Sequence, residues 1–331
     1  DKVWHLSNLY TIEGQKQLAD KFVSNCFADT VFFTNSGTES LECLIKIVRK
    51  YFNHINKPKK YRIITFEGAF HGRTLAALSA GKQKKHLDGF GPPLDGFDQV
   101  SFFDFKELKD KINDNTAAIL LEPIQGEGGI RVFPDKFIYQ VKELSEKNNI
   151  LLCFDEVQTG IGRTGNLFAH QIWDISPDIV ATAKGLGGGF PVGACLATEE
   201  VAAGMVPGTH GSTFGGNPLA MAAANAVMDT ILESKFLEKV SNLGEKLKSH
   251  LNKIKLNHKD RIQEIRGRGL MVGLKFNCPT EGLVNLLRTN GLLTVPAGDN
   301  VIRLLPPLIV KENDITKACN IIDETIKNWN T

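Results

Sequence analysis

Two continuously apolar runs constrain the fold of this chain more than any other feature. Residues 150–154 end in Asp155, and residues 179–183 end in Lys184, which a glycine-rich stretch follows. Because neither run alternates with polar residues, both predict strands buried on both faces, as in a parallel sheet covered by helices. Open α/β sheets bind their ligands at the carboxyl ends of strands. We therefore expect Asp155 and Lys184 to lie at that edge.

An aspartate and a lysine at such an edge indicate one kind of chemistry. A lysine shielded from water forms a Schiff base with an aldehyde cofactor. An aspartate nearby holds the pyridinium nitrogen of pyridoxal phosphate in its charged form. Alternatively, the two residues are a buried ion pair, or Lys184 is a surface lysine before a loop. On these two residues alone, both interpretations stay open.

Composition places the chain among ordinary globular proteins. With 331 residues it is long enough for one large core and a smaller lobe. A net charge of +2 gives no reason to expect nucleic acid or an anionic membrane as partner, and no apolar stretch reaches membrane-spanning length. The six cysteines form no C-x-x-C pair, and the histidines show no metal-ligand spacing. We expect reduced cysteines, a cytoplasmic location and no metal.

Small polar turns follow other predicted strands as well. Residues 31–34 predict a strand, and Ser36, Gly37 and Thr38 follow it at the start of an amphipathic segment that runs to about residue 52. A strand, a small turn and a helix point free N–H groups at an anion, so these residues are candidates for a phosphate site. A plain helix cap is the alternative.

An aromatic residue and an arginine follow the next predicted strand, residues 62–66. Phe70 and Arg73 are three residues apart, so the first could stack on a flat ring and the second pair with a carboxylate. A hydrophobic plug and a surface arginine are the alternative. Residues 81–98 predict a long excursion without a repeating pattern.

The remaining pattern predicts a mostly parallel α/β domain followed by a smaller α+β domain. Composition changes after about residue 235, where a lysine-rich helix leads into alternating short strands and helices. We expect an N-terminal helical segment over 1–30, a large domain over 31–235 and a small domain over 236–331. Further elements are expected as a strand at 117–121, a helix from 134 to 148, a strand within 190–197, a helix at 218–232, strands at 262–268, 270–276, 292–295 and 301–304, and helices at 280–290 and 311–329.

Seven motifs in order resemble those of one enzyme family. The set resembles the class III aminotransferases, which are fold type I pyridoxal-phosphate enzymes, and within them the enzymes that act on acetylornithine. The similarity covers nearly the whole chain but does not start at the family's N-terminus, so we expect a small N-terminal segment of the substrate pocket to be missing. The motifs are Ser36 to Glu39, Phe70 to Thr74, Glu122-Pro123 with Gln125 to Glu127, Asp155 to Gly160, Lys184-Gly185, Gly211 to Thr213, and Ile302-Arg303 before Pro306-Pro307.

The resemblance implies a role for each matched residue that contacts the cofactor. Lys184 is similar to the lysine that binds pyridoxal 5'-phosphate and shuttles the proton, and Asp155 to the partner of the pyridine nitrogen. Val157 and Phe70 would cover the two ring faces. The remaining implied contacts are Gln158 with the phenolic oxygen, Gly37 and Thr38 with the phosphate, and Thr213 with the phosphate of the neighbouring subunit, which requires a homodimer with shared active sites.

The resemblance also implies how two different substrates are bound. Arg73 is similar to the family's clamp for the substrate carboxylate, and Ser212 would lie near the substrate. Arg303 resembles the arginine that takes the α-carboxylate of 2-oxoglutarate or glutamate. Glu127 matches a glutamate that pairs with that arginine when the amine donor is bound, so a movable pair hides or exposes one positive charge.

Three functions are weighed. The first is transfer of an amino group from N2-acetyl-L-ornithine to 2-oxoglutarate in arginine biosynthesis, with ornithine, succinylornithine, succinyldiaminopimelate or 4-aminobutyrate as other donors. The second is a glutamate-semialdehyde aminomutase, which needs no carboxylate switch, so Glu127 and Arg303 argue against it. The third is a nucleotide- or phosphate-binding protein without covalent chemistry, for which the glycines at 185–189 are weak support.

Overall fold

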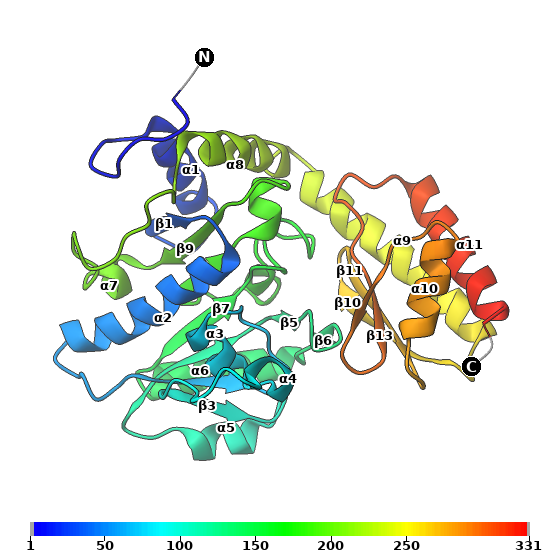
Figure 1. Cartoon of the computed structure of the whole chain (residues 1–331), viewed down its shortest axis with the longest axis horizontal. Coiled ribbons are helices and arrows are strands. Elements are labelled where there is room, and N and C mark those ends of the chain that lie inside the picture. Colours follow the sequence, from blue (N-terminus) through cyan, green and yellow to red (C-terminus); the bar gives the residue numbers. More distant parts are fainter. Residues whose placement is uncertain (1–2, 330–331) are drawn as a thin grey trace.

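The computed structural model describes residues 3–329, and it contains two main sheets (Figure 1) and a third sheet of two strands only. The larger sheet has seven strands in the order β1-β9-β8-β7-β4-β2-β3. Within it β9 alone runs opposite to the other six strands, so the prediction of a mostly parallel sheet is confirmed. In chain order these strands are β1 (Thr30–Thr34), β2 (Arg62–Phe66), β3 (Phe97–Val100), β4 (Thr116–Leu121), β7 (Leu151–Asp155), β8 (Ile179–Thr182) and β9 (Gly193–Ala197).

The central strand β7 shows why the apolar runs do not alternate. Leu152 and Phe154 point into the core on one face of the sheet, whereas Leu151 and Cys153 point into the core on the other. Full burial of a side chain such as Phe154 contributes about 1.5–3 kcal/mol, so both faces must be covered. The covering helices are α2 (Gly37–His54) and α3 (Leu75–Gly81) on one side, and α1 (Glu13–Val23), α6 (Asp135–Lys147) and α8 (Pro218–Ile231) on the other.

Helix α2 begins where a small polar turn reverses the chain after β1. The Ser36 side chain accepts a hydrogen bond from the Glu39 N–H (3.2 Å), and Glu39 Oε2 in return accepts one from the Asn35 N–H (2.7 Å). These reciprocal bonds satisfy donors at the start of the helix. They leave the N–H groups of Gly37 and Thr38 without an acceptor among residues 3–329.

The second sheet has four antiparallel strands and its own apolar core. Its order is β10-β11-β13-β12, and three helices pack against it on the C-terminal side of the molecule (Figure 1). This confirms the expected smaller α+β domain, while its boundary and that of the N-terminal segment stay predictions, and residues 1–2 and 330–331 lie outside the described part. The elements are α9 (Phe236–Asn257), β10 (Ile262–Arg268), β11 (Met271–Phe276), α10 (Glu281–Thr289), β12 (Val295–Ala297), β13 (Val301–Leu304) and α11 (Glu312–Lys327).

Several short elements were not expected from the sequence. The strand expected at 292–295 is β12 instead, because Gly291 (φ +87°) ends the turn after α10 and only Val295–Ala297 pairs with β13. The excursion at 81–98 contains a helical turn and the start of β3. The unexpected elements are α4 (Lys84–Leu87), α5 (Phe105–Lys111), β5 (Ile124–Gln125), β6 (Arg131–Val132), α7 (Glu199–Ala202), and the 3₁₀ helices η1 (Ala169–Trp173) and η2 (Lys184–Gly187).

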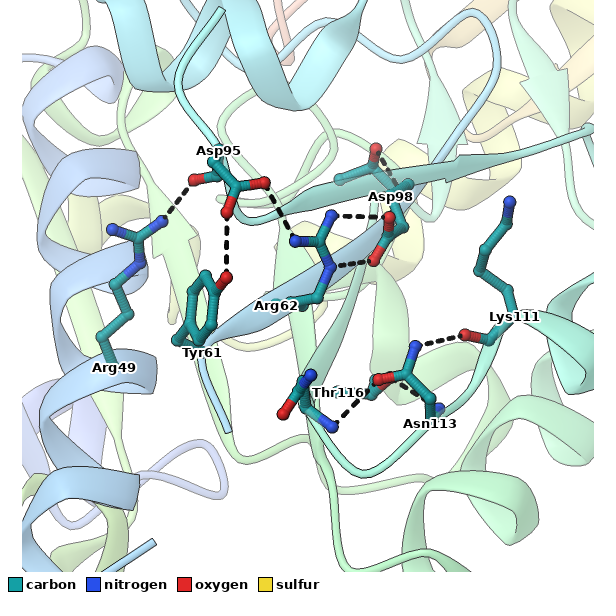
Figure 2. A network of polar contacts seen from close by, with 10 residues as sticks. Arg49, Tyr61, Arg62, Asp95, Asp98, Lys111, Asn113 and Thr116 are labelled. Atoms are coloured by element: carbon teal, nitrogen blue, oxygen red, sulfur yellow. Dashed lines mark hydrogen bonds and ion pairs between the residues drawn. The ribbon is translucent and has the colours of Figure 1, made fainter. Parts of the chain in front are cut away.

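An ion-pair network fastens the edge strand β3 to β2 (Figure 2). Arg62 on β2 binds both carboxylate oxygens of Asp98 on β3, at 2.7 and 2.9 Å. Its third nitrogen donates to Asp95 (2.9 Å), which also accepts from the Tyr61 hydroxyl. Between residues 3 and 329, no helix is long and apolar enough to cross a membrane.

Candidate active site

Asp155 and Lys184 line the same cavity, which has a volume of about 440 Å³. Parallel pairing of β7 with β8 sets Asp155 opposite Ala181, and Lys184 follows two residues after β8 ends. Lys184 has a φ of +43°, in the left-handed region that a non-glycine residue occupies at a cost of roughly 1–2 kcal/mol. Such strain is concentrated at functional sites. The two charged residues therefore meet because their strands are neighbours.

A buried histidine orients Asp155. His71 Nδ1 lies 2.8 Å from Asp155 Oδ2, and the Val157 N–H donates to Asp155 Oδ1 (3.1 Å). Burial lowers the pKa of His71, but its hydrogen bond to Asp155 and the charges of Asp155 and Glu122 outweigh this, so the pKa lies above its usual value. His71 Nε2 is buried and has no hydrogen-bond partner within residues 3–329. A protonated His71 would pair with the Asp155 carboxylate and fix its orientation.

Glu122 is the second carboxylate of this cluster. It lies just beyond the end of β4 and accepts hydrogen bonds from the N–H groups of Phe70 (2.9 Å) and Gly126 (3.2 Å). Burial, and then repulsion by Asp155, raise the pKa of Glu122 to about 7. His71 and Glu122 both stand in motifs of the sequence, but the sequence alone predicted a role for neither. The signal available was a carboxylate at the end of a fully apolar strand.

One end of the cavity is shaped to receive an anion. The unpaired N–H groups of Gly37 and Thr38 lie at the N-terminus of the 18-residue helix α2, where the helix dipole favours negative charge. A Cβ on Gly37 would lie 2.7 Å from Val157 Cγ1, so only glycine fits there. Gln158 lines the same cavity, and its buried Oε1 has no partner within the described residues.

The aromatic and aliphatic residues expected to cover a ring also line this cavity. Phe70 is half-buried and Val157 approaches the start of α2. Glu127 lies on the same wall, and its Oε1 is 2.7 Å from Arg303 Nη1 on β13. The Arg303 side chain is only 5% exposed, and neither its Nε nor its Nη1 makes an aligned hydrogen bond in the described part of the chain. A buried guanidinium with unused donors is suited to a carboxylate ligand.

Four of the predicted site residues lie outside the cavity lining. Arg303 is one of them, and it meets the lining through Glu127. Arg73 is exposed, with its Cζ 5.5 Å from the centre of the Phe70 ring. Ser212 Oγ accepts hydrogen bonds from Asn35 Nδ2 (3.2 Å) and from the Gly215 N–H (2.9 Å), so it is joined to the cavity wall only through Asn35. Thr213 is exposed in the single chain.

Residues 1–326 match the family model for class-III aminotransferases. The chain belongs to the class III aminotransferases. It is 55% identical to the acetylornithine aminotransferase of Agrobacterium fabrum, over 93% of this chain and 77% of that protein. It is 53% identical to the acetylornithine aminotransferase of Brucella melitensis, over 99% of this chain and 81% of that protein.

Solved structures agree with this family assignment. The ornithine aminotransferase from Toxoplasma gondii superposes with a TM-score of 0.94 at 30% identity, covering 99% of this chain and 79% of that one. The acetylornithine aminotransferase from Stenotrophomonas maltophilia gives 0.85 at 35% identity, covering 99% of this chain and 83% of that one. The chain is therefore a transaminase of fold type I.

Class III aminotransferases use pyridoxal phosphate, and the residues present fit that group. The free N–H groups at the start of α2 suit its phosphate, Asp155 suits a protonated ring nitrogen, and the orphaned Gln158 Oε1 suits a polar ring substituent. In the part of the chain that the structure describes, no cluster of three or more histidines, cysteines or carboxylates could hold a metal ion.

Proposed function

We propose that this chain is an ω-aminotransferase that moves an amino group from N2-acetyl-L-ornithine to 2-oxoglutarate. The products would be N-acetyl-L-glutamate 5-semialdehyde and L-glutamate, a step of arginine biosynthesis. The observation that carries the proposal is that Lys184, Asp155 and the unpaired N-terminus of α2 line one cavity. The acetylornithine aminotransferases at 53–55% identity support the choice of substrate.

In this proposal, pyridoxal 5'-phosphate supplies a protonated ring that withdraws electrons from the carbon losing its proton. Lys184 would hold the cofactor, and its Nζ would carry that proton. Asp155, fixed by His71, would face the ring nitrogen. Phe70 and Val157 would cover the ring, Gln158 would contact its phenolic oxygen, and Gly37 and Thr38 would hold the phosphate; all of these residues line the cavity.

The pair Glu127–Arg303 addresses the problem of two unlike substrates in one pocket. With the amine donor, Arg73 takes the donor's carboxylate, Ser212 lies nearby, and Glu127 neutralises Arg303 at 2.7 Å. With 2-oxoglutarate, Glu127 moves aside and Arg303 receives the second carboxylate in a charge-assisted bond. An intramolecular aminomutase needs no such exchange, so this pair favours transfer between two substrates.

We further propose that the enzyme is a cytoplasmic homodimer. Thr213 is exposed in the single chain, and in a dimer with shared active sites it would reach the phosphate bound by the neighbouring subunit. Thr213 and Ser212 precede α8 in one glycine-rich loop, so both would be fixed by dimer formation.

Substituting Lys184→Ala tests the assignment most directly. The variant should lose the visible absorbance of lysine-bound cofactor and at least about 100–10,000-fold of its turnover, the range that a positioned proton-transfer group supplies. Lys246→Ala is the matched control, because Lys246 makes an exposed ion pair with Glu312. Normal transamination by Lys184→Ala would refute the role of this lysine.

A panel of amine donors with 2-oxoglutarate tests the substrate. We expect the highest kcat/KM with N2-acetylornithine, since specificity is a ratio of these values. Ornithine is the second candidate donor, favoured by the close superposition on the ornithine aminotransferase from Toxoplasma gondii. A higher kcat/KM for ornithine would replace the proposed substrate, and failure of 2-oxoglutarate to accept an amino group from any donor would refute the proposed transfer.

A further inference from the structure

Arg163 is a half-buried arginine without a carboxylate partner in the described part of the chain. Its Nη1 donates instead to two main-chain carbonyls, Leu270 O (3.1 Å) and Pro306 O (2.6 Å). Burial lowers the pKa of Arg163 to about 10. Removing a charge from water without a counter-ion is unfavourable, so these carbonyls must offset a real cost. The place of these two carbonyls in the fold explains why the arginine lies there.

The turn that carries Arg163 docks the small domain against the large one. The Leu270 N–H donates back to Arg163 O (3.1 Å), so the two residues are joined in both directions. Gly269 has a φ of +54°, and a Cβ there would lie 2.5 Å from the carbonyl carbon of Thr164. The backbones approach so closely that only glycine fits. This contact is therefore a fixed point between the two domains.

Arg163 binds the same end of two paired strands. Leu270 immediately precedes β11, and Pro306 follows β13 by two residues. The first rung of that ladder pairs Val272 with Leu304, and the next pairs Gly273 with Arg303. The guanidinium thus joins the two strand ends at Pro306, three residues beyond Arg303. A shift of these ends would reach Arg303 through Leu304 and Leu305.

The other side of the same turn leads into the cavity wall. Arg163 lies five residues after Gln158, and the chain between them packs against the site. A Cβ on Gly160 would lie 2.7 Å from Glu156 O, and one on Gly162 would lie 3.2 Å from Leu308 Cδ1. One short segment therefore connects the end of β7, which carries Asp155, to the strand that carries Arg303.

We propose that Arg163 is a positioning residue for the dicarboxylate substrate, holding the end of the β11–β13 ladder so that Arg303 reaches the cavity. This rests on the proposed function, in which Arg303 receives the second carboxylate of 2-oxoglutarate. The effect of Arg163 is selective, because the amine donor is bound through Arg73 on the opposite domain. Loss of the clamp moves Arg303 and leaves the lysine, the ring partner and Arg73 in place.

The test compares Arg163→Met and Arg163→Lys with a matched arginine elsewhere. Arg261 also binds main-chain carbonyls at one nitrogen, Ile326 O (2.8 Å) and Trp329 O, and its Cζ lies 5.8 Å from the Trp329 ring centre. Arg261→Met therefore removes the same kind of clamp within the small domain only. Each holoenzyme is titrated calorimetrically with glutarate, a dicarboxylate that cannot be transaminated, and kcat/KM is measured separately for 2-oxoglutarate and for the amine donor.

We expect Arg163→Met to weaken glutarate binding by about 10-fold or more, since misplacing a group by about 1 Å costs up to about 100-fold. The kcat/KM for 2-oxoglutarate should fall by the same factor, and that for the amine donor should stay within about 2-fold. The affinity of Arg163→Lys for glutarate should lie between that of the wild type and that of Arg163→Met, because an ammonium lacks the planar fork of arginine. Arg261→Met should lower the unfolding temperature without changing glutarate binding.

Equal losses for both substrates, or unchanged glutarate binding in Arg163→Met, would overturn the inference. If that variant does not fold, Arg163→Lys decides by the same criterion. Arg303→Met separates this inference from the proposed function. Should Arg303→Met bind glutarate as well as the wild type, the proposed carboxylate site itself is wrong. Should it lose binding while the Arg163 variants keep it, only the positioning role fails.

Discussion

Two regions of the molecule each place one cationic side chain beside two carboxylates. In one region the pKa of a carboxyl group is lowered, and in the other it is raised. At the sheet edge, Arg62 binds Asp98 through two nitrogens and Asp95 through a third (Figure 2). In the cavity wall, His71 lies against Asp155, and the charge of Glu122 also raises the pKa of His71. The edge network is reached by water, whereas the cavity cluster is buried.

The difference appears in how each carboxylate holds its proton. Hydrogen bonds from Arg62 lower the pKa of Asp98 and that of Asp95, the latter to about 2, so both stay ionised at neutral pH. Burial and the charge of Asp155 instead raise the pKa of Glu122 to about 7. The carboxylates of the edge network do not change their charge near neutral pH, and the network fastens two strands. The cavity cluster has a group that titrates near neutral pH, a property concentrated at functional sites.

The same substitution at each site gives the largest expected contrast. Asp155→Asn should lower kcat/KM for both substrates by about 100-fold, because a charge-assisted bond of about 1.5–3 kcal/mol is lost. It also removes the anion that His71 faces. Asp98→Asn should leave kcat/KM unchanged. Steady-state rates with both substrates measure this, and comparable losses in the two variants would erase the distinction between the regions.

Glu122→Gln sharpens the comparison through the pH dependence of stability. In the wild type the pKa of Glu122 is about 7 in the folded state and about 4.5 when unfolded. The folded state therefore holds a proton that the unfolded state releases, so this contribution to stability is complete below pH 4.5 and is lost as pH rises through 7. The raised pKa of His71 acts in the same direction.

The unfolding free energy of the wild type should decline between about pH 4.5 and 7. We expect this decline to be smaller in Glu122→Gln, by on the order of 1–3 kcal/mol. Urea unfolding at several pH values measures it. The matched control is Glu107→Gln, whose carboxylate accepts from the Ser101 N–H (2.8 Å) and has a lowered pKa because of that bond. Because a lowered pKa gives stability that is complete above the unfolded value of about 4.5 and is lost as pH falls, Glu107→Gln should change the pH slope only below about pH 4.5. An unchanged slope in Glu122→Gln would show that the carboxylate does not titrate in this range.

The strands of the site could be predicted from the sequence, but the contacts between distant residues could not. The apolar runs before Asp155 and Lys184 predicted two doubly buried strands, and their register brings both residues to one cavity. The roles of His71 and Glu122 were not predicted, although both stand in the quoted motifs. Glu122 meets the Phe70 N–H across 52 residues, and His71 meets Asp155 across 84. Contacts at that separation depend on the packing of β2, β4 and β7, which no local pattern encodes.

The edge network was missed for a related reason. Strand β3 has polar residues at Asp98 and Gln99 between the buried Phe97 and Val100, so it lacks the continuous apolar pattern of β7. It pairs only with β2, and an edge strand tolerates polar side chains on its faces. Residues 81–98, which are rich in glycine and proline and lead into this strand, show no repeating pattern either. This strand is identified by its pairing with β2, and the sequence alone does not indicate that pairing.

The smallest expected effects lie within the edge network itself and test whether it acts as a unit. Asp98→Asn should lower the unfolding free energy by about 1 kcal/mol, because it breaks a bidentate pair that is mostly shielded from water. Asp95→Asn should cause no measurable loss, since the Asp95 side chain is 72% exposed and water screens its pairing with Arg62. Urea midpoints at low and high salt measure both. If Asp95→Asn were as costly as Asp98→Asn, Arg62 would depend on both carboxylates together, and the edge network would act as a unit.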